Sequence, residues 1–536
     1  MTLLAEATKK ALVPLDLMLH RLRVGHGIPS ALHVVAERLD RRSPSVLPRR
    51  ELERIRAEAS LVKERYAGQR LSLVVSRLPQ ASPRDLVELP ASCREQLTLT
   101  SQQVTPAALR ATSEWLRDKG LRALRELPIR RILDVLDRAS LKWLDPEYAH
   151  RSLAIEAIHR YTGFSREMVI HSIDLEMRSS RRLDLWRTLL VELGNPAVLD
   201  RPAWTVSGET SRARAFGPDL LTAVFSSNIP ALPHLSYMRG LAVKSPVLAK
   251  VATHEPIFAS LYLDTLIELC PSLKDALAAV WFPGGSVELE REMHAASGHV
   301  IAYGSHESLA ALAERLPSKT PRLLHSHRMG VGVLERSALE LGERWAPRVA
   351  YDFCAFDGQA CLAPIVYFLE GSLAPAKSFA TSVSQAANAL GTWLPRRALD
   401  ANDAAARRLT VERWHTRSVF QPDEVGFIRG PEPGPAWAGL ITTGGYRPER
   451  LGDRLFHFHC VDSLEQVAAS LREYASSLQN VALAGDEQRC QALASELASL
   501  GASRATRPGL MPTPSMMWHH DGHACIGSLV RWSDLA

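Results

Sequence analysis

The sequence lacks most marks of secreted, membrane-spanning and nucleic-acid-binding proteins. No run of eighteen apolar residues occurs in its 536 residues, and Glu6 with two lysines interrupts the place where an export signal needs an apolar stretch. The seven cysteines show no C-x-x-C spacing, which favours free thiols in a reducing, cytoplasmic compartment. The 64 basic and 58 acidic side chains are interspersed. Neither nucleic-acid binding nor stable membrane insertion is therefore indicated.

The sequence is that of a large globular chain, and its pattern of apolar residues differs between the first part and the later part. Apolar residues make up 46% and charged residues 23% of the sequence, which is enough to build cores for several domains. Up to about residue 195, apolar residues recur at helical spacing, and this part is expected to be mostly helices. Its first hundred residues look like an extension or docking element.

After residue 217, short apolar runs alternate with amphipathic stretches. This rhythm predicts βαβ units and a mainly parallel α/β sheet, with ligands bound where strands end. Residues 421–448 look like a loop, and the last hundred residues return to strand, helix and strand. Strands are expected at residues 220–225, 245–250, 278–282, 300–303, 323–325, 348–351 and 364–368, and helices at residues 255–269, 287–296, 308–316 and 337–344.

One cysteine stands apart by its surroundings. Cys361 ends the stretch Gly358-Gln-Ala-Cys and precedes an apolar run. Its thiol is therefore expected on a loop beside a buried strand, after a tight turn at Gly358. Backbone amides can position a thiolate there for attack on a substrate. A buried core cysteine is the alternative.

Two further fragments precede this cysteine. Asn228, in Ser-Ser-Asn-Ile-Pro, follows an expected strand and offers a side-chain amide that can stabilise an oxyanion; capping of the next turn is the alternative. Lys250 ends the next expected strand, where phosphate or ribose contacts are common; a solvated surface lysine is the alternative.

In their order and spacing, these fragments resemble the aldehyde dehydrogenase superfamily. Asn228 falls on the Asn of its P-W-N-F/Y-P motif, Lys250 on the Lys of its K-P-S-E motif, and Cys361 on the nucleophile of its G-Q-x-C motif. Within the superfamily, residues 351–361 and the run Trp-His-His-Asp-Gly at 518–522 look like the acyl-CoA reductase (LuxC) branch. The resemblance covers roughly residues 135–536.

The resemblance implies an aldehyde dehydrogenase-like α/β fold with four parts. These are a helical N-terminal extension of unknown role (residues 1–100), a Rossmann-type cofactor domain (101–320), an α/β catalytic domain with the nucleophilic cysteine (321–490), and a C-terminal segment that returns to the active site or to an oligomer interface (491–536). It also implies a reaction: Cys361 attacks a fatty acyl-CoA, its own backbone N–H and Asn228 hold the oxyanion, and NADPH reduces the acyl-cysteine to an aldehyde.

One departure from the superfamily bears on the reaction. Oxidising members carry a glutamate upstream of the nucleophile, where it activates water to hydrolyse the acyl-enzyme. The corresponding stretch here, residues 324–330, has no carboxylate and carries His325. The loss of this base fits a reductase that keeps water from its thioester. His325 is the candidate to donate a proton to the departing thiolate or to the thiohemiacetal.

The expected cofactor is NADPH. Where NAD-preferring relatives often have a glutamate after the strand-end lysine, this chain has Thr253, and an uncharged hydroxyl beside Lys250 suits a 2′-phosphate. Gly304 and Ser305 resemble the superfamily's F-T-G-S segment near the pyrophosphate and nicotinamide. The family glutamate that binds the nicotinamide ribose has no assigned counterpart in residues 447–458.

Histidine-rich patches raise the question of a metal site. His325 with His327, and His457 with His459, have the i, i+2 spacing that places both rings on one face of a strand, and residues 519–525 hold three more histidines. These spacings match no zinc module and the expected reaction needs no metal, so no metal site is assigned. A zinc site and hydrogen-bonded strand histidines remain the alternatives.

Other functions fit the same motifs. The donor could be an acyl carrier protein thioester in place of acyl-CoA, and the chain could be a catalytically inactive scaffold that binds partners through its N-terminal extension. The resemblance further implies a homo-oligomer and leaves room for an acyl-activating or acyl-transferring partner protein.

Overall fold

The computed structural model describes residues 46–79, 86–89, 96–205, 212–226, 228–430, 436–449 and 451–535. The expected helices of residues 1–45 lie outside the described residues. Residues 47–536 form one unit. Within the described ranges, no helix is both long enough and apolar enough to cross a membrane.

The first part of this unit is a layer of helices with a small sheet at its edge. Strand β3 lies between β1, which runs parallel to it, and β2, which runs antiparallel. Leu71 and Leu73 of β1 are buried while Ser72 is exposed, the period-2 pattern of a half-buried strand. The segment up to residue 195 is mostly helices, as expected, and this small sheet is an addition within it. The elements are α3 (Arg49–Arg65), β1 (Leu71–Val74), β2 (Leu86–Glu88), β3 (Leu97–Gln102), α4 (Pro106–Trp115), α5 (Leu121–Glu126), α6 (Ile129–Trp143), α7 (Ala149–Thr162), α8 (Arg166–Ser179) and α9 (Arg182–Leu193).

A buried arginine joins three of these helices. Arg151 of α7 is 0% exposed; its Nε lies 2.5 Å from a carboxylate oxygen of Glu58 on α3, and its Nη1 lies 2.8 Å from Asp174 on α8. Replacement of Arg151 by Met leaves both buried carboxylates without this partner. We expect it to lower the stability of this layer by about 3–5 kcal/mol, measured as a lower urea midpoint. Arg50→Met, at an exposed position of α3, is the control, and an equal shift in both variants would contradict this account.

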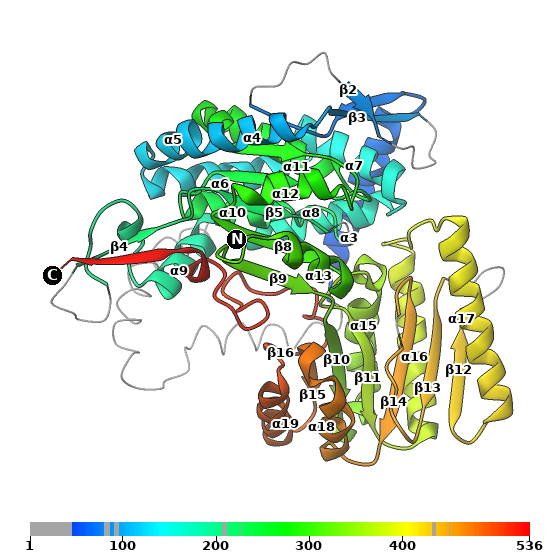
Figure 1. Ribbon diagram of the computed structural model, residues 1–536. Coiled ribbons are helices and arrows are strands. Elements are labelled where there is room, and N and C mark those ends of the chain that lie inside the picture. Colours follow the sequence, from blue (N-terminus) through cyan, green and yellow to red (C-terminus); the bar gives the residue numbers. More distant parts are fainter. Residues whose placement is uncertain are drawn as a thin grey trace. The chain divides into compact units, whose positions relative to one another are not determined.

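A five-stranded parallel sheet follows, in the order β7-β6-β5-β8-β9. This is the Rossmann-type order, in which the strand sequence reverses between β5 and β8 and ligands bind beyond the carboxyl ends at that point. Figure 1 shows it in green, with helices packed around it. The elements are β4 (Arg212–Phe216), β5 (Leu221–Val224), α10 (His234–Ala242), β6 (Val247–Lys250), α11 (Ile257–Leu269), β7 (Leu277–Val280), α12 (Val287–Ala295), β8 (His299–Gly304), α13 (His306–Arg315) and β9 (Arg322–Ser326).

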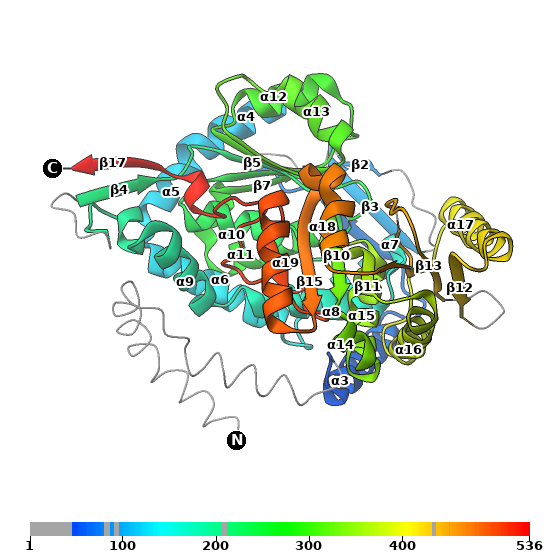
Figure 2. The ribbon, with the colours of Figure 1, turned by 90° about the horizontal axis from the view of Figure 1, so that it is seen from below.

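A seven-stranded sheet forms the second body, in the order β12-β13-β14-β11-β10-β15-β16, and only the β12–β13 pair is antiparallel. Helices α18 and α19 cover one face (Figure 2), while α15 and α16 pack on the other. The elements are β10 (Met329–Leu334), α14 (Arg336–Glu340), α15 (Gly342–Cys354), β11 (Pro364–Glu370), α16 (Leu373–Gly391), α17 (Ala401–Phe420), β12 (Val425–Arg429), β13 (Ala438–Thr442), β14 (Leu455–Val461), α18 (Glu465–Leu471), β15 (Leu478–Ala484), α19 (Glu487–Leu500) and β16 (Arg504–Thr506).

Three expectations from the sequence are wrong in this body. Residues 348–351 belong to α15 and not to a strand. The short apolar run Val-Ala-Tyr at 349–351 resembles a strand by itself, but Trp345, Val349 and Phe353 recur at helical spacing along the whole element. Strand β10 was missed because glycines interrupt it. At Gly332 a Cβ atom would lie 2.1 Å from the ring of Tyr367, so close packing requires the glycine. Residues 421–448, read as a loop, contain β12 and β13.

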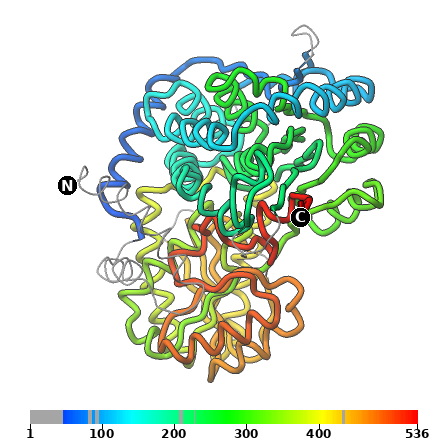
Figure 3. The backbone as a smooth tube through the Cα atoms, turned by 90° about the vertical axis from the view of Figure 1, so that its left-hand side faces the viewer, coloured from blue at the N-terminus to red at the C-terminus, as the bar shows by residue number. Residues whose placement is uncertain are grey.

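The C-terminal segment returns to the part of the chain that holds the five-stranded sheet. Residues 507–530 run between the two sheets, drawn in red in Figure 3. The chain then ends in β17 (Arg531–Leu535), which pairs antiparallel with β4.

Candidate active site

A cavity of about 1310 Å³ lies where the two bodies and the C-terminal segment meet. Five of the residues singled out from the sequence line it: Asn228, Gly304, Ser305, His325 and Cys361. The fold explains this convergence. Asn228 follows β5, Gly304 ends β8 and Ser305 follows it, and these are the two strands at which the order of the parallel sheet reverses.

Cys361 lies on a tight loop between α15 and β11. Phe356, Asp357 and Gly358 have φ angles of 52°, 53° and 71°, and three consecutive left-handed residues reverse the chain sharply. Asp357 is held by the guanidinium of Arg454, with Nε 2.7 Å from Oδ1. The tight turn expected at Gly358 is confirmed, and it places the half-buried thiol at the cavity wall.

The surroundings of Cys361 keep its thiol protonated. Burial, together with the negative charges of Asp521 and Glu176, raises the pKa of Cys361 to about 12, although the backbone N–H groups of Cys361 and Leu362 oppose this rise. The thiol therefore needs a base to take its proton when it attacks a substrate.

Asn228 is fixed beside this loop. Its Oδ1 accepts a hydrogen bond from the hydroxyl of Ser226 at 2.7 Å, and its Nδ2 donates to the carbonyl of Gln359 at 3.0 Å. An amide nitrogen carries two N–H groups, so one remains for a ligand next to Cys361. This arrangement is compatible with the expected oxyanion role.

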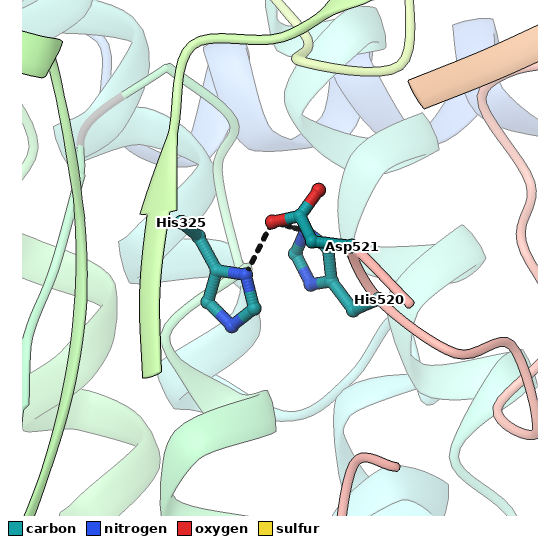
Figure 4. Close-up of side chains that lie close together, drawn as sticks. All are labelled: His325, His520 and Asp521. Atoms are coloured by element: carbon teal, nitrogen blue, oxygen red, sulfur yellow. Dashed lines mark hydrogen bonds and ion pairs between the residues drawn. The ribbon is translucent and has the colours of Figure 1, made fainter. Parts of the chain in front are cut away.

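His325, at the end of β9, forms a buried pair with Asp521 of the C-terminal segment (Figure 4). The Nδ1 atom lies 2.7 Å from Oδ2 of Asp521, whose Oδ1 accepts from Nε2 of Gln479 at 2.6 Å. Although burial alone would raise it, the pKa of Asp521 falls to about 2 because of its bond to His325. The ionised carboxylate can only accept, so Nδ1 carries the proton. Nε2 of His325 is buried and has no hydrogen-bond partner among the described residues.

Aromatic rings hold His325 in place. Its ring stacks on His520 with centroids 3.9 Å apart and on Tyr303 at 4.9 Å, and His520 stacks in turn on Trp518 at 4.6 Å. Burial lowers the pKa of His325, against the opposing effect of Asp521. The imidazole is therefore neutral near pH 7, with Nε2 as an available base.

The same residues also resemble a possible metal site. Ligand atoms of His325, His520 and Asp521 lie within 4.8 Å of one another. The lone pair of an imidazole nitrogen lies in the ring plane, so two nearly parallel rings 3.9 Å apart cannot both aim at one tetrahedral ion. The absence of a metal site stays a prediction, and the ring geometry favours it.

The other strand histidines serve the core. His457 and His459 lie on the same face of β14, as their spacing predicts, and both hydrogen-bond to Oγ1 of Thr442, at 2.9 and 2.8 Å. Both are buried. They are the hydrogen-bonded strand histidines that the sequence left as an alternative to metal binding.

The residues expected to bind the cofactor divide into two groups. Gly304 and Ser305 line the cavity, and Ser305 caps α13 by accepting from the N–H of Ser308 at 3.2 Å. A helix N-terminus at this point suits a phosphate group. Lys250 and Thr253 do not line the cavity. The Lys250 ammonium lies 4.8 Å from the ring centroid of Phe282, and burial lowers its pKa; Thr253 is exposed.

The sequence analysis gave no role to two acidic residues of the site: Asp521, which pairs with His325, and Glu176. Asp521 was visible only as part of the C-terminal Trp-His-His-Asp-Gly motif, without a role. Glu176 of α8 lines the cavity, and burial raises its pKa to about 7 although Arg239 opposes this rise. Nothing in its helix distinguishes Glu176 from a solvated glutamate. The stretch that ends β9 has no carboxylate, as expected, but a carboxyl group reaches the cavity from another element.

Alkylation of Cys361 tests this electrostatic account. Because the reactive thiolate is a small fraction well below a pKa of about 12, the rate of reaction with iodoacetamide should rise about tenfold per pH unit from about pH 7 to about pH 9. Mass spectrometry of the peptide that contains Cys361 follows the rate. A plateau beginning near pH 7 would show that a group in the free protein already holds the thiolate.

Comparisons with known proteins agree with the geometry. A profile of the acyl-CoA reductase (LuxC) family matches residues 124–532. The long-chain acyl-protein thioester reductase of Photorhabdus luminescens is 22% identical over 411 residues, which cover 76% of this chain and 82% of that protein. Long-chain acyl-protein thioester reductase 2 of Photobacterium leiognathi is 21% identical over 450 residues, 82% of this chain and 88% of that protein.

Solved structures show the fold. Aldehyde dehydrogenase 21 from Physcomitrella patens, in complex with succinate, superposes with a TM-score of 0.67 at 10% identity and covers 87% of this chain and 98% of its own. NADP-dependent glyceraldehyde-3-phosphate dehydrogenase from Bacillus halodurans, complexed with NADP, gives 0.63 at 10% identity, with 85% and 97% covered. The resemblance drawn from the sequence is confirmed: the chain has the aldehyde dehydrogenase fold and belongs to the acyl-CoA reductase (LuxC) family.

Proposed function

We propose that this protein reduces a long-chain acyl thioester to the aldehyde through an acyl intermediate on Cys361. The observation that carries the proposal is that one cavity is lined by a thiol, an oriented amide and a histidine paired with a carboxylate. The names of the relatives, long-chain acyl-protein thioester reductases, support the same substrate class.

The first step is acyl transfer to the enzyme. Cys361 Sγ attacks the thioester carbonyl, and its proton passes to Nε2 of His325, which is free because Nδ1–H donates to Asp521. The carbonyl oxygen becomes an oxyanion that the backbone N–H of Cys361 and Nδ2 of Asn228 stabilise. Collapse breaks the carbon–sulfur bond to the donor, and His325 returns the proton to the departing thiolate.

The second step is reduction of the acyl-cysteine. A nicotinamide cofactor, when bound, supplies the hydride for this step. Gly304 and Ser305 at the start of α13 would hold its phosphates, since both line the cavity at a helix N-terminus. Hydride addition turns the acyl carbonyl into a thiohemiacetal oxyanion, which the backbone N–H of Cys361 and Nδ2 of Asn228 hold. Its collapse re-forms the carbonyl and breaks the carbon–sulfur bond. Aldehyde leaves, and the thiolate of Cys361 takes up one proton from solvent through Nε2 of His325.

Two donors are candidates for this reaction, and acyl-CoA is the one we propose. An acyl group carried on a protein is the second candidate, and the names of the relatives favour it. We also propose a homo-oligomer, with room for an acyl-transferring partner protein, in a reducing compartment such as the cytoplasm. The six described cysteines are free thiols, which supports that location.

We further propose that the cofactor is NADPH. Lys250→Ala should weaken binding of NADPH far more than binding of NADH, because it removes a charge-assisted contact to the 2′-phosphate. Thr253→Glu should shift the preference toward NADH by like-charge repulsion. Michaelis constants for both cofactors in the wild-type protein and the two variants check this. Equal constants in the wild-type protein would contradict the cofactor proposal.

A direct assay tests the function. Purified protein is mixed with acyl-CoAs of several chain lengths or with acyl carrier protein thioesters, each with NADPH, and the nicotinamide absorbance is followed while aldehyde is quantified. Turnover with one donor class identifies the substrate. No turnover with either class, in protein that still binds NADPH, would favour the inactive scaffold.

A further inference from the structure

An arginine on helix α17 combines a place in the cavity wall with an unused hydrogen-bond donor. Arg407 of α17, the yellow helix in Figure 1, lines the same cavity as Cys361. Its Nε donates to the backbone carbonyl of Asp453 at 3.0 Å. Its Nη2 is buried and has no hydrogen-bond partner in the described part of the chain. A buried N–H of a guanidinium is strongly disfavoured unless it has a hydrogen-bond acceptor.

A second guanidinium lies next to it. Nη1 of Arg396 is also buried without a partner among the residues that the structure describes. Burial and the charge of Arg396 lower the pKa of Arg407 to about 10, so the two groups are close enough to repel each other. Both remain charged near neutral pH.

The nearby carboxylates do not neutralise this pair of arginines. Arg397 binds Asp453, with Nε 2.6 Å from Oδ1, and Asp403, with Nη2 2.8 Å from Oδ2. Arg454 binds Asp357 at 2.7 Å. Arg397 and Arg454 therefore contact all three of these carboxylates, and none of the three accepts a hydrogen bond from Nη2 of Arg407 or Nη1 of Arg396.

We propose that Arg407, with Arg396 beside it, forms a phosphate-binding site in the cavity that contains Cys361. The planar fork of a guanidinium matches phosphate oxygens, and the open Nη2 donor of Arg407 lies at the cavity. The proposal rests on the proposed function, which brings two phosphate-bearing molecules here. One is the phosphopantetheine arm, common to CoA and carrier-protein thioesters, and the other is the nicotinamide half of the cofactor.

Paired ligands that differ by one phosphate separate these sources. Calorimetry would measure binding of 4′-phosphopantetheine against pantetheine, and of reduced nicotinamide mononucleotide against reduced nicotinamide riboside. We expect Arg407→Gln to weaken the phosphorylated member of one pair by roughly 10- to 100-fold and to leave its unphosphorylated partner unchanged. The affected pair identifies the source of the phosphate.

Arg408→Gln is the matched control, because Arg408 is the next residue of α17 but is exposed and does not line the cavity. Arg407→Lys keeps the positive charge but not the planar pair of N–H donors, so it should give an intermediate loss of affinity. Such a graded loss would show that the effect of Arg407→Gln is not a folding defect. Equal effects of Arg407→Gln and Arg408→Gln, or equal effects on both members of each pair, would overturn the proposal.

Because binding is measured without turnover, this test is independent of the proposed function. If wild-type protein binds the phosphorylated ligand through Arg407 but forms no aldehyde, the proposed function alone is refuted. If the protein forms aldehyde but shows no phosphate-dependent binding at Arg407, the phosphate-site proposal alone is refuted.

Discussion

Replacement of Cys361 by Ser should abolish aldehyde formation and covalent labelling by an acyl thioester, with activity falling by at least about 10³-fold. A serine hydroxyl at this position is a far weaker nucleophile than the thiol. The variant should still bind NADPH, because the substitution leaves the helix N-terminus at Gly304 and Ser305 intact. Aldehyde production and intact-protein mass would be measured together.

Cys354 provides the internal control. It lies seven residues earlier, at the end of α15, and is 0% exposed in the hydrophobic core. Cys354→Ala should lower stability slightly and retain both labelling and aldehyde formation. Acyl labelling that persists in Cys361→Ser would refute the assignment of the nucleophile.

Loss of the His325–Asp521 pair should have the second largest effect. His325→Gln removes the proton carrier of both proposed steps and should lower the rate of aldehyde formation by about 10²- to 10⁴-fold. Asp521→Asn leaves the imidazole in place but no longer fixes the proton on Nδ1, and a loss of roughly 10²-fold is expected. Rates with saturating acyl-CoA and NADPH measure both losses.

The pH profile separates a proton-transfer role from a structural one. Burial lowers the pKa of His325 and the Asp521 carboxylate opposes this, so activity should fall on acidification through a pKa below the usual value of about 6.5. Removal of the carboxylate destabilises the protonated imidazole. In Asp521→Asn the acidic limb should therefore move to lower pH while the maximal rate drops. A lower rate with an unshifted profile would indicate that Asp521 only supports the fold.

The main elements of the fold could be predicted because their patterns are local. Strands β5 to β9 and the helices between them follow from apolar runs of strand length, and the motifs at Asn228 and Cys361 each lie directly beside such a run. Strand β10 was not predictable from its pattern, since its glycines are required by the packing of Tyr367 on a neighbouring strand. Part of helix α15 was predicted as a strand because residues 349–351 form a short apolar run, although the apolar residues of the whole helix recur at helical spacing.

The candidate site was only half predictable for a related reason. Asn228 and His325 lie at the carboxyl ends of predicted strands of one sheet, where topology brings residues together. Cys361 precedes a strand of the other sheet. Asp521 is 196 residues from His325 in sequence, and Glu176 and Arg407 lie on helices whose cavity-facing side no sequence period reveals. Such contacts arise from how the C-terminal segment and the helices pack, which is a property of the folded chain.

The most direct test of the central claim follows the acyl-enzyme when NADPH is withheld. Protein is mixed with a long-chain acyl-CoA, and its intact mass, the acylated peptide and any free fatty acid are followed over minutes before NADPH is added. We predict a stable acyl group on Cys361 that NADPH converts to aldehyde. Release of free acid from the wild-type protein would contradict the reductase account, and its suppression by Glu176→Gln would identify the carboxyl group that activates the water.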